Sequence, residues 1–265
     1  MTLTAPPLTS SKPSIRQLVQ AKRPVVNGWL SMPGGFGAEL AARAGYDSLT
    51  LDMQHGMLGF GDVLNMLLSI GGVGTPTLVR VPSAFDHVKA DVMMQVLDAG
   101  AGGIIAPQMD SPAIAAQIVS ACRYPPMGLR SHGPTRAGQA FGPDYPKRAN
   151  AEILAIGMIE SQAALDQLDA ILDTPGLDGI YIGPNDLSLS MGVAAKSEPD
   201  DPRVVAAIER VRIAAQSRGL IAGIFCTDGE ACAHRFKQGF DMATPAHDVA
   251  ALMQGQRQRL AAARA

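Results

Sequence analysis

Eight short apolar segments, each followed by sequence with helical periodicity, restrict how this chain can fold more than any other feature. Several are apolar at nearly every position, which is typical of strands covered on both faces in a parallel sheet. They lie at 25–30, 48–52, 77–81, 103–107, 154–159, 179–182, 220–225 and 240–243. Eight such strands alternating with helices predict a single-domain (β/α)8 TIM barrel. An open doubly wound sheet is the alternative, because one miscounted strand would change the topology.

The segments between the expected strands are rich in Ala and Leu, and many end in glycine. Clear helical patterns cover 38–44, 62–70, 88–99, 113–121 and 202–218. Gly45, Gly100, Gly219 and Gly239 follow the ends of expected helices, where glycine accepts the left-handed conformation that terminates a helix. Each of these glycines leads into the next apolar segment, as the repeating turns of a barrel require.

Composition excludes several other classes of protein. The 265 residues are 47% hydrophobic and 17% charged, which argues against disorder. The formal net charge is −2 and the basic residues are scattered, so no stripe indicates nucleic-acid binding. No apolar run reaches the ~18 residues of a membrane helix. Cys122, Cys226 and Cys232 form no CxxC motif, and we expect reduced thiols in a cytoplasmic protein.

Two segments lie outside the alternating pattern. Residues 1–18 are polar and proline-rich, without the apolar centre of a signal peptide, and we expect a loose tail before a barrel over 19–265. Residues 123–150 have no clear period and are rich in Gly and Pro. A loop of this length in a compact domain is usually functional or disordered. We interpret it as a candidate wall of the active site, with an oligomer contact or a mobile surface loop as alternatives.

Polar residues gather where several expected strands end, and barrel enzymes carry their catalytic groups at those ends. Asp52 and His55 follow the second strand, and Arg80 lies near the end of the third. Glu160 ends the fifth, and Asp186 follows the sixth. Because parallel strands bring these ends to one rim, we expect the five side chains to face a common site.

Glu160 and Asp186 are the expected metal ligands, since Mg²⁺ typically takes one or two protein carboxylates and leaves other positions to water and substrate. Each also has a structural interpretation. Glu160 stands at the start of a helix, where a carboxylate is favourable, and Asp186 can cap a helical turn. The occurrence of both at neighbouring strand ends favours the metal site.

His55, Arg80 and Asp98 each allow two interpretations. His55 is either a structural histidine or a proton-transfer group. Arg80 is either half of a buried ion pair with Asp52 or a donor to a developing enolate oxygen. Asp98 ends an expected helix, where the charge of a carboxylate is unfavourable next to the negative end of the helix dipole. Either a partner such as His55 compensates this charge, or the side chain is exposed to solvent.

Seven short motifs lie in order over about residues 20–250: LDMQHG at 51–56, VRVP at 79–82, VLDAGA at 96–101, RYPP at 123–126, IES at 159–161, YIGPNDLS at 181–188 and MG at 191–192. Together they are highly specific. With these motifs the chain resembles the HpcH/HpaI family of metal-dependent (class II) pyruvate aldolases. In this chain Gln54 stands where many relatives have an acidic residue, and Met158 where many have a glutamine. Residues 83–89 are a few positions longer than in many relatives.

The resemblance implies a lyase that cleaves a 4-hydroxy-2-oxo acid into an aldehyde and pyruvate, or a pyruvate analogue such as hydroxypyruvate. It implies Mg²⁺ or Mn²⁺, with Co²⁺ as an alternative, held by Glu160 and Asp186. His55 would be the acid/base, oriented by Asp98, and Arg80 would hold the keto or enolate oxygen. The substrate carboxylate would meet the turn at Gly183, Pro184 and Asn185, and Arg130 would approach the aldehyde.

The same resemblance implies a homo-oligomer, a hexamer, and no Schiff-base lysine. The apolar positions of the expected C-terminal helix over 249–263 would then pack on a neighbouring subunit. Two other functions stay open. One is an acyl-CoA thioester lyase, which needs a basic surface for the nucleotide that the sequence does not display. The other is a non-catalytic barrel that serves as a binding module.

Overall fold

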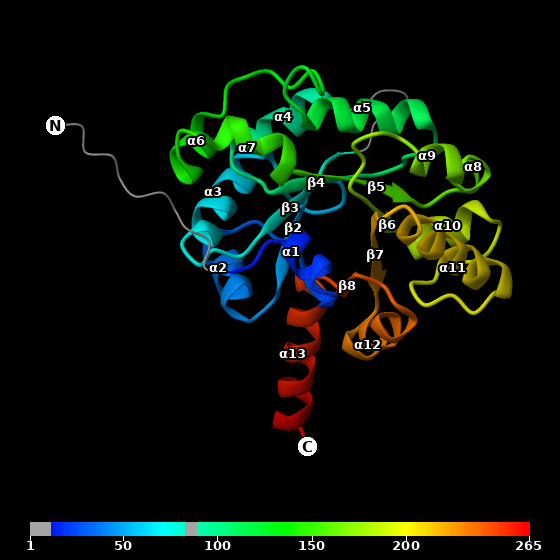
Figure 1. Ribbon diagram of the computed structural model, residues 1–265. Coiled ribbons are helices and arrows are strands. Elements are labelled where there is room, and N and C mark those ends of the chain that lie inside the picture. The colour runs from blue at the N-terminus through cyan, green and yellow to red at the C-terminus, as the bar shows by residue number, and fades with distance from the viewer. Residues whose placement is uncertain (1–11, 83–88) are drawn as a thin grey trace.

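The computed structural model describes residues 12–82 and 89–265, and in them eight parallel strands close into one barrel (Figure 1). The strands pair in chain order, and β1 also pairs with β8. They are β1 (Val25–Leu30), β2 (Ser48–Asp52), β3 (Thr77–Arg80), β4 (Gly103–Ala106), β5 (Leu154–Ile159), β6 (Gly179–Ile182), β7 (Ile221–Cys226) and β8 (Met242–Pro245). The predicted (β/α)8 barrel is confirmed, and the open sheet is excluded.

Helices surround the barrel on its outer side (Figure 1). They are α1 (Ile15–Gln20), α2 (Gly35–Arg43), α3 (Phe60–Gly71), α4 (Ala90–Asp98), α5 (Pro112–Cys122), α6 (Thr135–Phe141), α7 (Tyr145–Glu152), α8 (Gln162–Asp166), α9 (Leu168–Leu172), α10 (Pro184–Ser190), α11 (Pro202–Gln216), α12 (Gly229–Gln238) and α13 (Asp248–Ala263). The four helix-ending glycines all have positive φ, between 73° and 107°. These turns need glycine because other residues pay a steric penalty there.

Two hydrophobic cores hold the barrel together. The larger lies between the strands and the surrounding helices, and it contains residues such as Leu49, Val79 and Ile104. The smaller fills the barrel interior around Trp29 and Tyr181, whose ring centroids are 5.5 Å apart. Because both faces of every strand are buried, the strands are apolar at almost every position. This is why they were recognisable in the sequence.

Ordered structure begins earlier than the expected boundary at residue 19. Ser14 caps α1, and its hydroxyl accepts from the backbone N–H of Gln17 while the Gln17 side chain accepts from the Ser14 N–H. Ile15 and Leu18 are buried in the smaller core, below the barrel interior. The residues 12–18 of the expected loose tail are therefore part of the folded barrel, and residues 1–11 lie outside the described part of the chain.

The segment 123–150 lies at the amino-terminal end of the barrel strands. Helix α5 runs back from the carboxyl end of β4, so the chain leaves it at the opposite face of the barrel. Arg123 donates to the carbonyl of Ile153, just before β5. Part of the segment is helical, as α6 and the start of α7. The segment therefore forms no wall of the rim where this chain's strands end.

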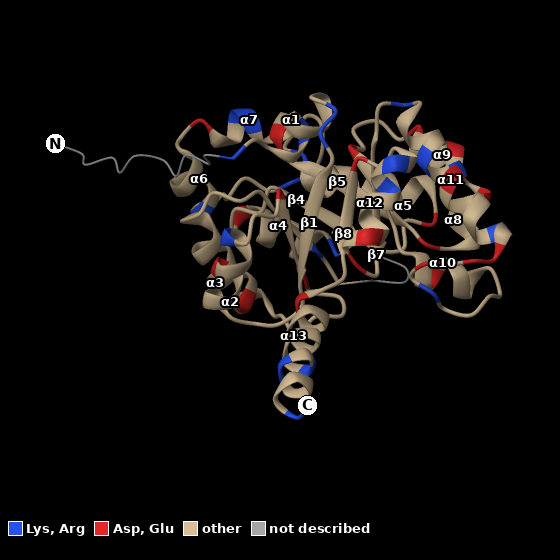
Figure 2. Ribbon diagram, turned by 90° about the horizontal axis from the view of Figure 1, so that it is seen from below, with Lys and Arg blue, Asp and Glu red and all other residues tan. Residues whose placement is uncertain are grey.

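Helix α13 extends from the barrel towards the C-terminus with little cover from the described chain (Figure 1). None of its residues is buried, and Leu252, Met253 and Leu260 are about half exposed, at 49%, 45% and 52%. None of the helices in 12–82 and 89–265 is long and apolar enough to cross a membrane. Acidic and basic residues are interspersed over the surface, in keeping with the scattered charges of the sequence (Figure 2).

Candidate active site

A cavity of about 450 Å³ opens at the carboxyl ends of the strands. Most strands contribute to it, directly or through the loop that follows. Its lining includes Trp29, Ser31, Met32, Asp52, His55, Met57, Arg80, Met158, Tyr181, Gly183, Pro184, Asn185, Asp186, Ser197, Phe225, His247 and Val249. Four of the five predicted strand-end residues, Asp52, His55, Arg80 and Asp186, line this cavity, and Glu160 lies behind Gly183 of the lining.

Arg80 forms a buried, two-pronged ion pair with Asp52. Its Nε donates to Asp52 Oδ1 at 2.9 Å and its Nη2 donates to Oδ2 at 2.6 Å. The guanidinium also stacks on Trp29, with Cζ 4.8 Å from the ring centroid, and the indole N–H donates to Asp52 at 3.2 Å. Burial by itself raises the pKa of Asp52, but the Arg80 hydrogen bonds and charge outweigh it and lower that pKa.

The ion pair of Arg80 with Asp52 is compatible with the second interpretation of Arg80 as a donor to a substrate oxygen. The ion pair with Asp52 is formed, and Arg80 still lines the cavity. The bidentate pair and the Trp29 ring fix the plane of the guanidinium, so its remaining N–H groups point in a set direction. A donor held in this way does not need to reorganise when negative charge develops beside it.

Glu160 is buried, with 4% of its surface exposed, and stands next to the turn that begins α10. Its Oε1 accepts from the backbone N–H of Gln108 at 2.8 Å. A Cβ added at Gly183 would lie 2.6 Å from Oε2, so the backbone can pass this close to the carboxylate only with glycine at position 183. Burial, followed by the charge of Asp186, raises the pKa of Glu160 to about 7, although the Gln108 N–H opposes the shift.

The residues fit a hard divalent ion. Glu160 Oε2 accepts no hydrogen bond from the described residues, and the carboxylate stands close enough to Asp186 for the second charge to raise the pKa of Glu160; a cation between the two would relieve that repulsion. Asp186 is exposed on the first turn of α10. Within the described residues no cluster of three or more His, Cys, Asp or Glu side chains is placed to hold a metal. Two carboxylates suit Mg²⁺ or Mn²⁺, and they do not suit a structural zinc site.

His55 lies in the tight turn that follows β2. Asp52 Oδ1 accepts from the backbone N–H groups of Gln54 and His55, at 3.0 and 3.2 Å. A Cβ at Gly56 would lie 2.2 Å from the Asp52 carbonyl oxygen, so this close approach requires glycine. Asp52 thus orients both Arg80 and the turn that carries His55. The side-chain carbonyl of Gln54 is buried and has no hydrogen-bond partner among the described residues.

Asp98 and Arg130 do not join this site within one chain. Asp98 ends α4, which runs antiparallel to the strands, so it lies at the other end of the barrel from His55. It pairs with Arg130, whose Nη2 donates at 2.7 Å. Arg130 is 1% exposed and packs over the Tyr124 ring at 4.5 Å. The local conflict of a carboxylate at a helix C-terminus is resolved by this arginine and not by His55.

Gly183, Pro184 and Asn185 form the predicted turn beside Glu160. Pro184 is the first residue of α10 and has no N–H, so the free backbone donors of the turn belong to the residues after it. The Asn185 amide donates to Ser197 Oγ at 3.1 Å, which ties the turn to the segment before α11.

Sequence reasoning missed the contributions of β1, β7 and β8. Trp29, Phe225 and His247 lie at or just beyond the ends of these strands and line the cavity. The same rule that found the other residues would have found them. Met158, noted as a departure from many relatives, also lines the cavity.

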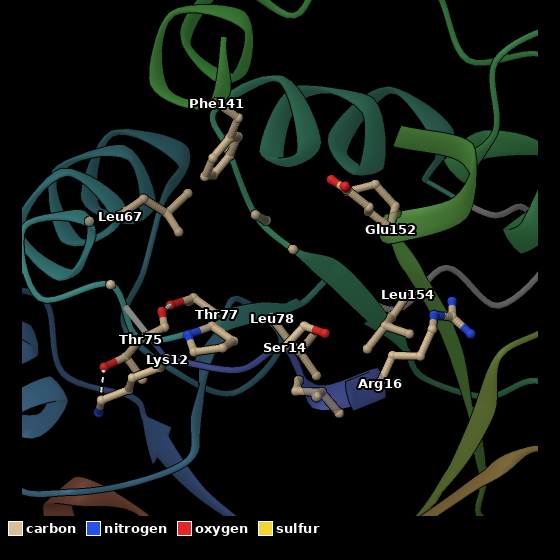
Figure 3. A pocket seen from close by; sticks show the side chains of 18 of the residues that line it. Lys12, Ser14, Arg16, Leu67, Thr75, Thr77, Leu78, Phe141, Glu152 and Leu154 are labelled. Atoms are coloured by element: carbon tan, nitrogen blue, oxygen red, sulfur yellow. Dashed lines mark hydrogen bonds between the residues drawn. The ribbon is translucent and has the colours of Figure 1, made fainter. Parts of the chain in front are cut away.

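A second, larger cavity of about 630 Å³ lies at the amino-terminal end of the barrel (Figure 3). Leu67, Phe141 and Leu154 border it, and Lys12 donates to Thr75 Oγ1 at 3.0 Å on one side (Figure 3). Neither the carboxylate pair nor His55 lies there. The smaller cavity is therefore the candidate active site, because His55, Arg80 and Asp186 line it and Glu160 lies directly behind Gly183 of its lining.

Comparisons with known proteins agree with this location. The model of the HpcH/HpaI aldolase/citrate lyase family matches residues 35–254. A hydroxypyruvate/pyruvate aldolase of Rhizorhabdus wittichii is 41% identical over 243 residues, which cover 92% of this chain and 95% of that protein. A 4-hydroxy-2-oxo-heptane-1,7-dioate aldolase of Salmonella dublin is 36% identical over 228 residues, with 85% and 84% covered.

Among solved structures, an HpcH/HpaI aldolase/citrate lyase family protein from Burkholderia cenocepacia superposes with a TM-score of 0.86. It is 32% identical, and the match covers 95% of this chain and 98% of that one. A closed barrel with carboxylate, imidazole and guanidinium groups at its strand ends is the arrangement of a barrel enzyme. The chain belongs to the HpcH/HpaI aldolase/citrate lyase family, and the predicted resemblance is confirmed.

Proposed function

We propose that this chain is a metal-dependent aldolase that reversibly cleaves a 4-hydroxy-2-oxo acid into an aldehyde and pyruvate or hydroxypyruvate. The observation that carries the proposal is the grouping of Asp186, Arg80 and His55 around one cavity at the strand ends, with the buried Glu160 carboxylate beside Gly183 of the lining and close enough to Asp186 and Arg80 to feel their charges. The names of the two aldolases described above support it, because both act on substrates of this class.

Glu160 and Asp186 would hold Mg²⁺ or Mn²⁺, with Co²⁺ as an alternative. When bound, such an ion supplies Lewis acidity that weakens the C3–H bonds of a chelated keto acid. The backbone N–H groups that follow Pro184 would donate to the substrate carboxylate. Arg80, fixed by Asp52, donates to the C2 oxygen where enolate charge develops.

His55 is the group suited to move the proton, because a neutral imidazole carries one nitrogen that accepts a proton and one that donates it. In the cleavage direction it accepts the C4 hydroxyl proton as the C3–C4 bond breaks, and in the aldol direction it returns that proton to the aldehyde oxygen. Asp98 and Arg130, expected to assist at this step, are paired with each other at the other end of this chain's barrel. Within one chain, the positioning of the His55 turn is assigned to Asp52.

The test separates metal binding from catalysis. Calorimetric titration with Mn²⁺ is compared for the wild type, Glu160→Gln and Asp186→Asn, and pyruvate proton exchange is followed by NMR in D₂O. We expect both variants to lose Mn²⁺ affinity and exchange activity, and chelation to abolish exchange until Mg²⁺ or Mn²⁺ is restored. Wild-type Mn²⁺ affinity in both variants would reject the metal assignment.

The same assay distinguishes the two alternative functions. An acyl-CoA lyase would show no metal-dependent exchange of pyruvate protons but would act on a thioester. A binding module would show neither reaction. No feature of the described residues favours either alternative.

We also propose a homo-oligomer, with a hexamer as the expected state, in which α13 packs on a neighbouring subunit. Support comes from the half-exposed Leu252, Met253 and Leu260 on a helix with no buried residue. Exposed apolar side chains of this kind typically mark an interface. Sedimentation at micromolar concentration tests the proposal, and a monomer would contradict it.

A further inference from the structure

We propose that His247 binds the aldehyde and selects aldehydes that carry a hydroxyl on the carbon next to the carbonyl. The inference rests on the aldolase function proposed above and assigns a substrate contact to a residue outside that mechanism. His247 lies two residues beyond β8 and lines the candidate active site together with His55.

The backbone around His247 is held in place on both sides. Ala246 has a φ of +63°, a left-handed conformation that is strained for a residue with a side chain. Its N–H donates to the carbonyls of Cys226 and Thr244, at 3.0 and 3.1 Å. Strain of this kind persists only where the surrounding structure enforces it, and it concentrates at functional sites.

Asp248 fixes the other side. Its carboxylate accepts from the backbone N–H groups of Ser31 and Met32 at 2.9 and 3.1 Å, which joins the end of β8 to the loop after β1. Ser31 and Met32 also line the cavity. His247 is therefore presented from a rigid wall built by β8 and the loop that follows β1.

The imidazole has one nitrogen committed to the protein. Nδ1 accepts from the backbone N–H of Ala250 at 3.3 Å, so His247 caps α13. A neutral imidazole that accepts at Nδ1 carries its hydrogen on Nε2. His247 can therefore offer an Nε2–H donor to a ligand in the cavity. Its neighbours in the lining on this side, Phe225 and Val249, are apolar.

The position of His247 suits the aldehyde half of the substrate. The keto acid would occupy the side of the cavity near Arg80, which ends β3, and near Glu160 and Asp186, which follow β5 and β6. The aldehyde must then approach from the remaining side, formed by β8, β1 and the turn carrying His55. With the carbonyl oxygen at His55, the substituent of the aldehyde meets His247.

A hydroxyl next to the carbonyl can accept from Nε2–H, whereas a methyl group of similar size cannot. A neutral hydrogen bond of this type gives a preference of about fivefold to tenfold for the hydroxyaldehyde. The experiment compares kcat/KM for glycolaldehyde and propionaldehyde with pyruvate as the donor. The two aldehydes have similar size and differ by the terminal hydroxyl.

Two substitutions separate the Nε2 donor from the helix cap. His247→Asn keeps a side-chain acceptor for the Ala250 N–H but is too short to replace Nε2. His247→Gln places an amide N–H near the original Nε2 position. His234→Asn, on the exposed face of α12, serves as the matched control.

We expect the wild type to prefer glycolaldehyde, His247→Asn to lose that preference by about fivefold to tenfold, and His247→Gln to recover part of it. His234→Asn should behave as the wild type. An unchanged glycolaldehyde-to-propionaldehyde ratio in His247→Asn would overturn the proposal, as would a wild type with no preference.

Pyruvate proton exchange separates this proposal from the function on which it rests, because exchange requires no aldehyde. If wild-type exchange occurs but the aldehyde ratio is insensitive to His247, only the present inference fails. If the wild type shows no metal-dependent exchange, the aldolase function itself fails. A general loss of fold in His247→Asn would lower both aldehyde reactions and exchange together, without the change in ratio that the proposal requires.

Discussion

Glu160 should make the metal-free protein less stable as pH rises. Its ordinary pKa is 4.5, and burial together with the charge of Asp186 raises the pKa to about 7 in the folded state. Well below pH 4.5 the carboxyl is protonated in both the folded and the unfolded chain. Its burial then does not lower the free energy of unfolding through ionisation. As pH rises towards 7, the unfolded chain ionises first and is favoured relative to the folded one.

The size of the effect follows from the difference between the two pKa values. Each pKa unit corresponds to ~1.4 kcal/mol, so the full cost of the ionised carboxylate is on the order of 3 kcal/mol above pH 7. Glu160 is 4% exposed, so solvent does not screen this cost strongly. Glu160→Gln removes the ionisable group and with it this part of the pH dependence.

The assay is urea unfolding of chelator-treated protein, with wild type and Glu160→Gln at equal concentration. Between pH 5 and pH 8 the free energy of unfolding of the wild type should fall by about 2 to 3 kcal/mol relative to that of the variant. Mn²⁺ at about 100 times its Kd should return a similar amount, about 2.7 kcal/mol, to the wild type at pH 8. Parallel pH profiles for the two proteins would refute the assignment of a raised pKa to Glu160.

Three further predictions concern the other residues of the barrel. Arg80→Ala should slow pyruvate proton exchange and aldol cleavage together, by ~10²–10³. His55→Ala should reduce the cleavage rate more than the exchange rate. Near-normal rates on a less stable protein would assign both residues a structural role. Asp98→Ala leaves the buried Arg130 without its carboxylate and should cost about 3 kcal/mol in denaturant unfolding, which an unchanged midpoint would contradict. Leu252→Glu on α13 should shift the sedimentation profile to smaller species, and an unchanged profile would remove that helix from the interface.

The barrel was predictable because its signals are local. Strands buried on both faces must be apolar throughout, and the helix ends need glycine at positive φ. The errors at strand boundaries were small: the two last expected strands were each placed one or two residues early. The rim residues followed from topology alone, since eight parallel strands present all their carboxyl ends on one face.

The residues that one chain does not bring to the cavity depend on contacts between distant segments. Asp98 and Arg130 are 32 positions apart, and their pairing arises from the packing of α4 against the chain that leaves α5. The same geometry sends residues 123–150 to the amino-terminal end of the barrel. Such pairings cannot be read from periodicity, because a helix that ends in a carboxylate can meet any cation that the fold brings to it.

The sequence by itself determined the eight-stranded barrel, the family and the strand-end positions of Glu160, Asp186, Arg80 and His55, because each is encoded by a period or a motif. Only the tertiary structure decided that Asp52 holds Arg80 against Trp29, that Glu160 is buried enough to raise its pKa, and that His247 shares the cavity. Burial and through-space contact set these properties, and they exist only once the barrel has closed.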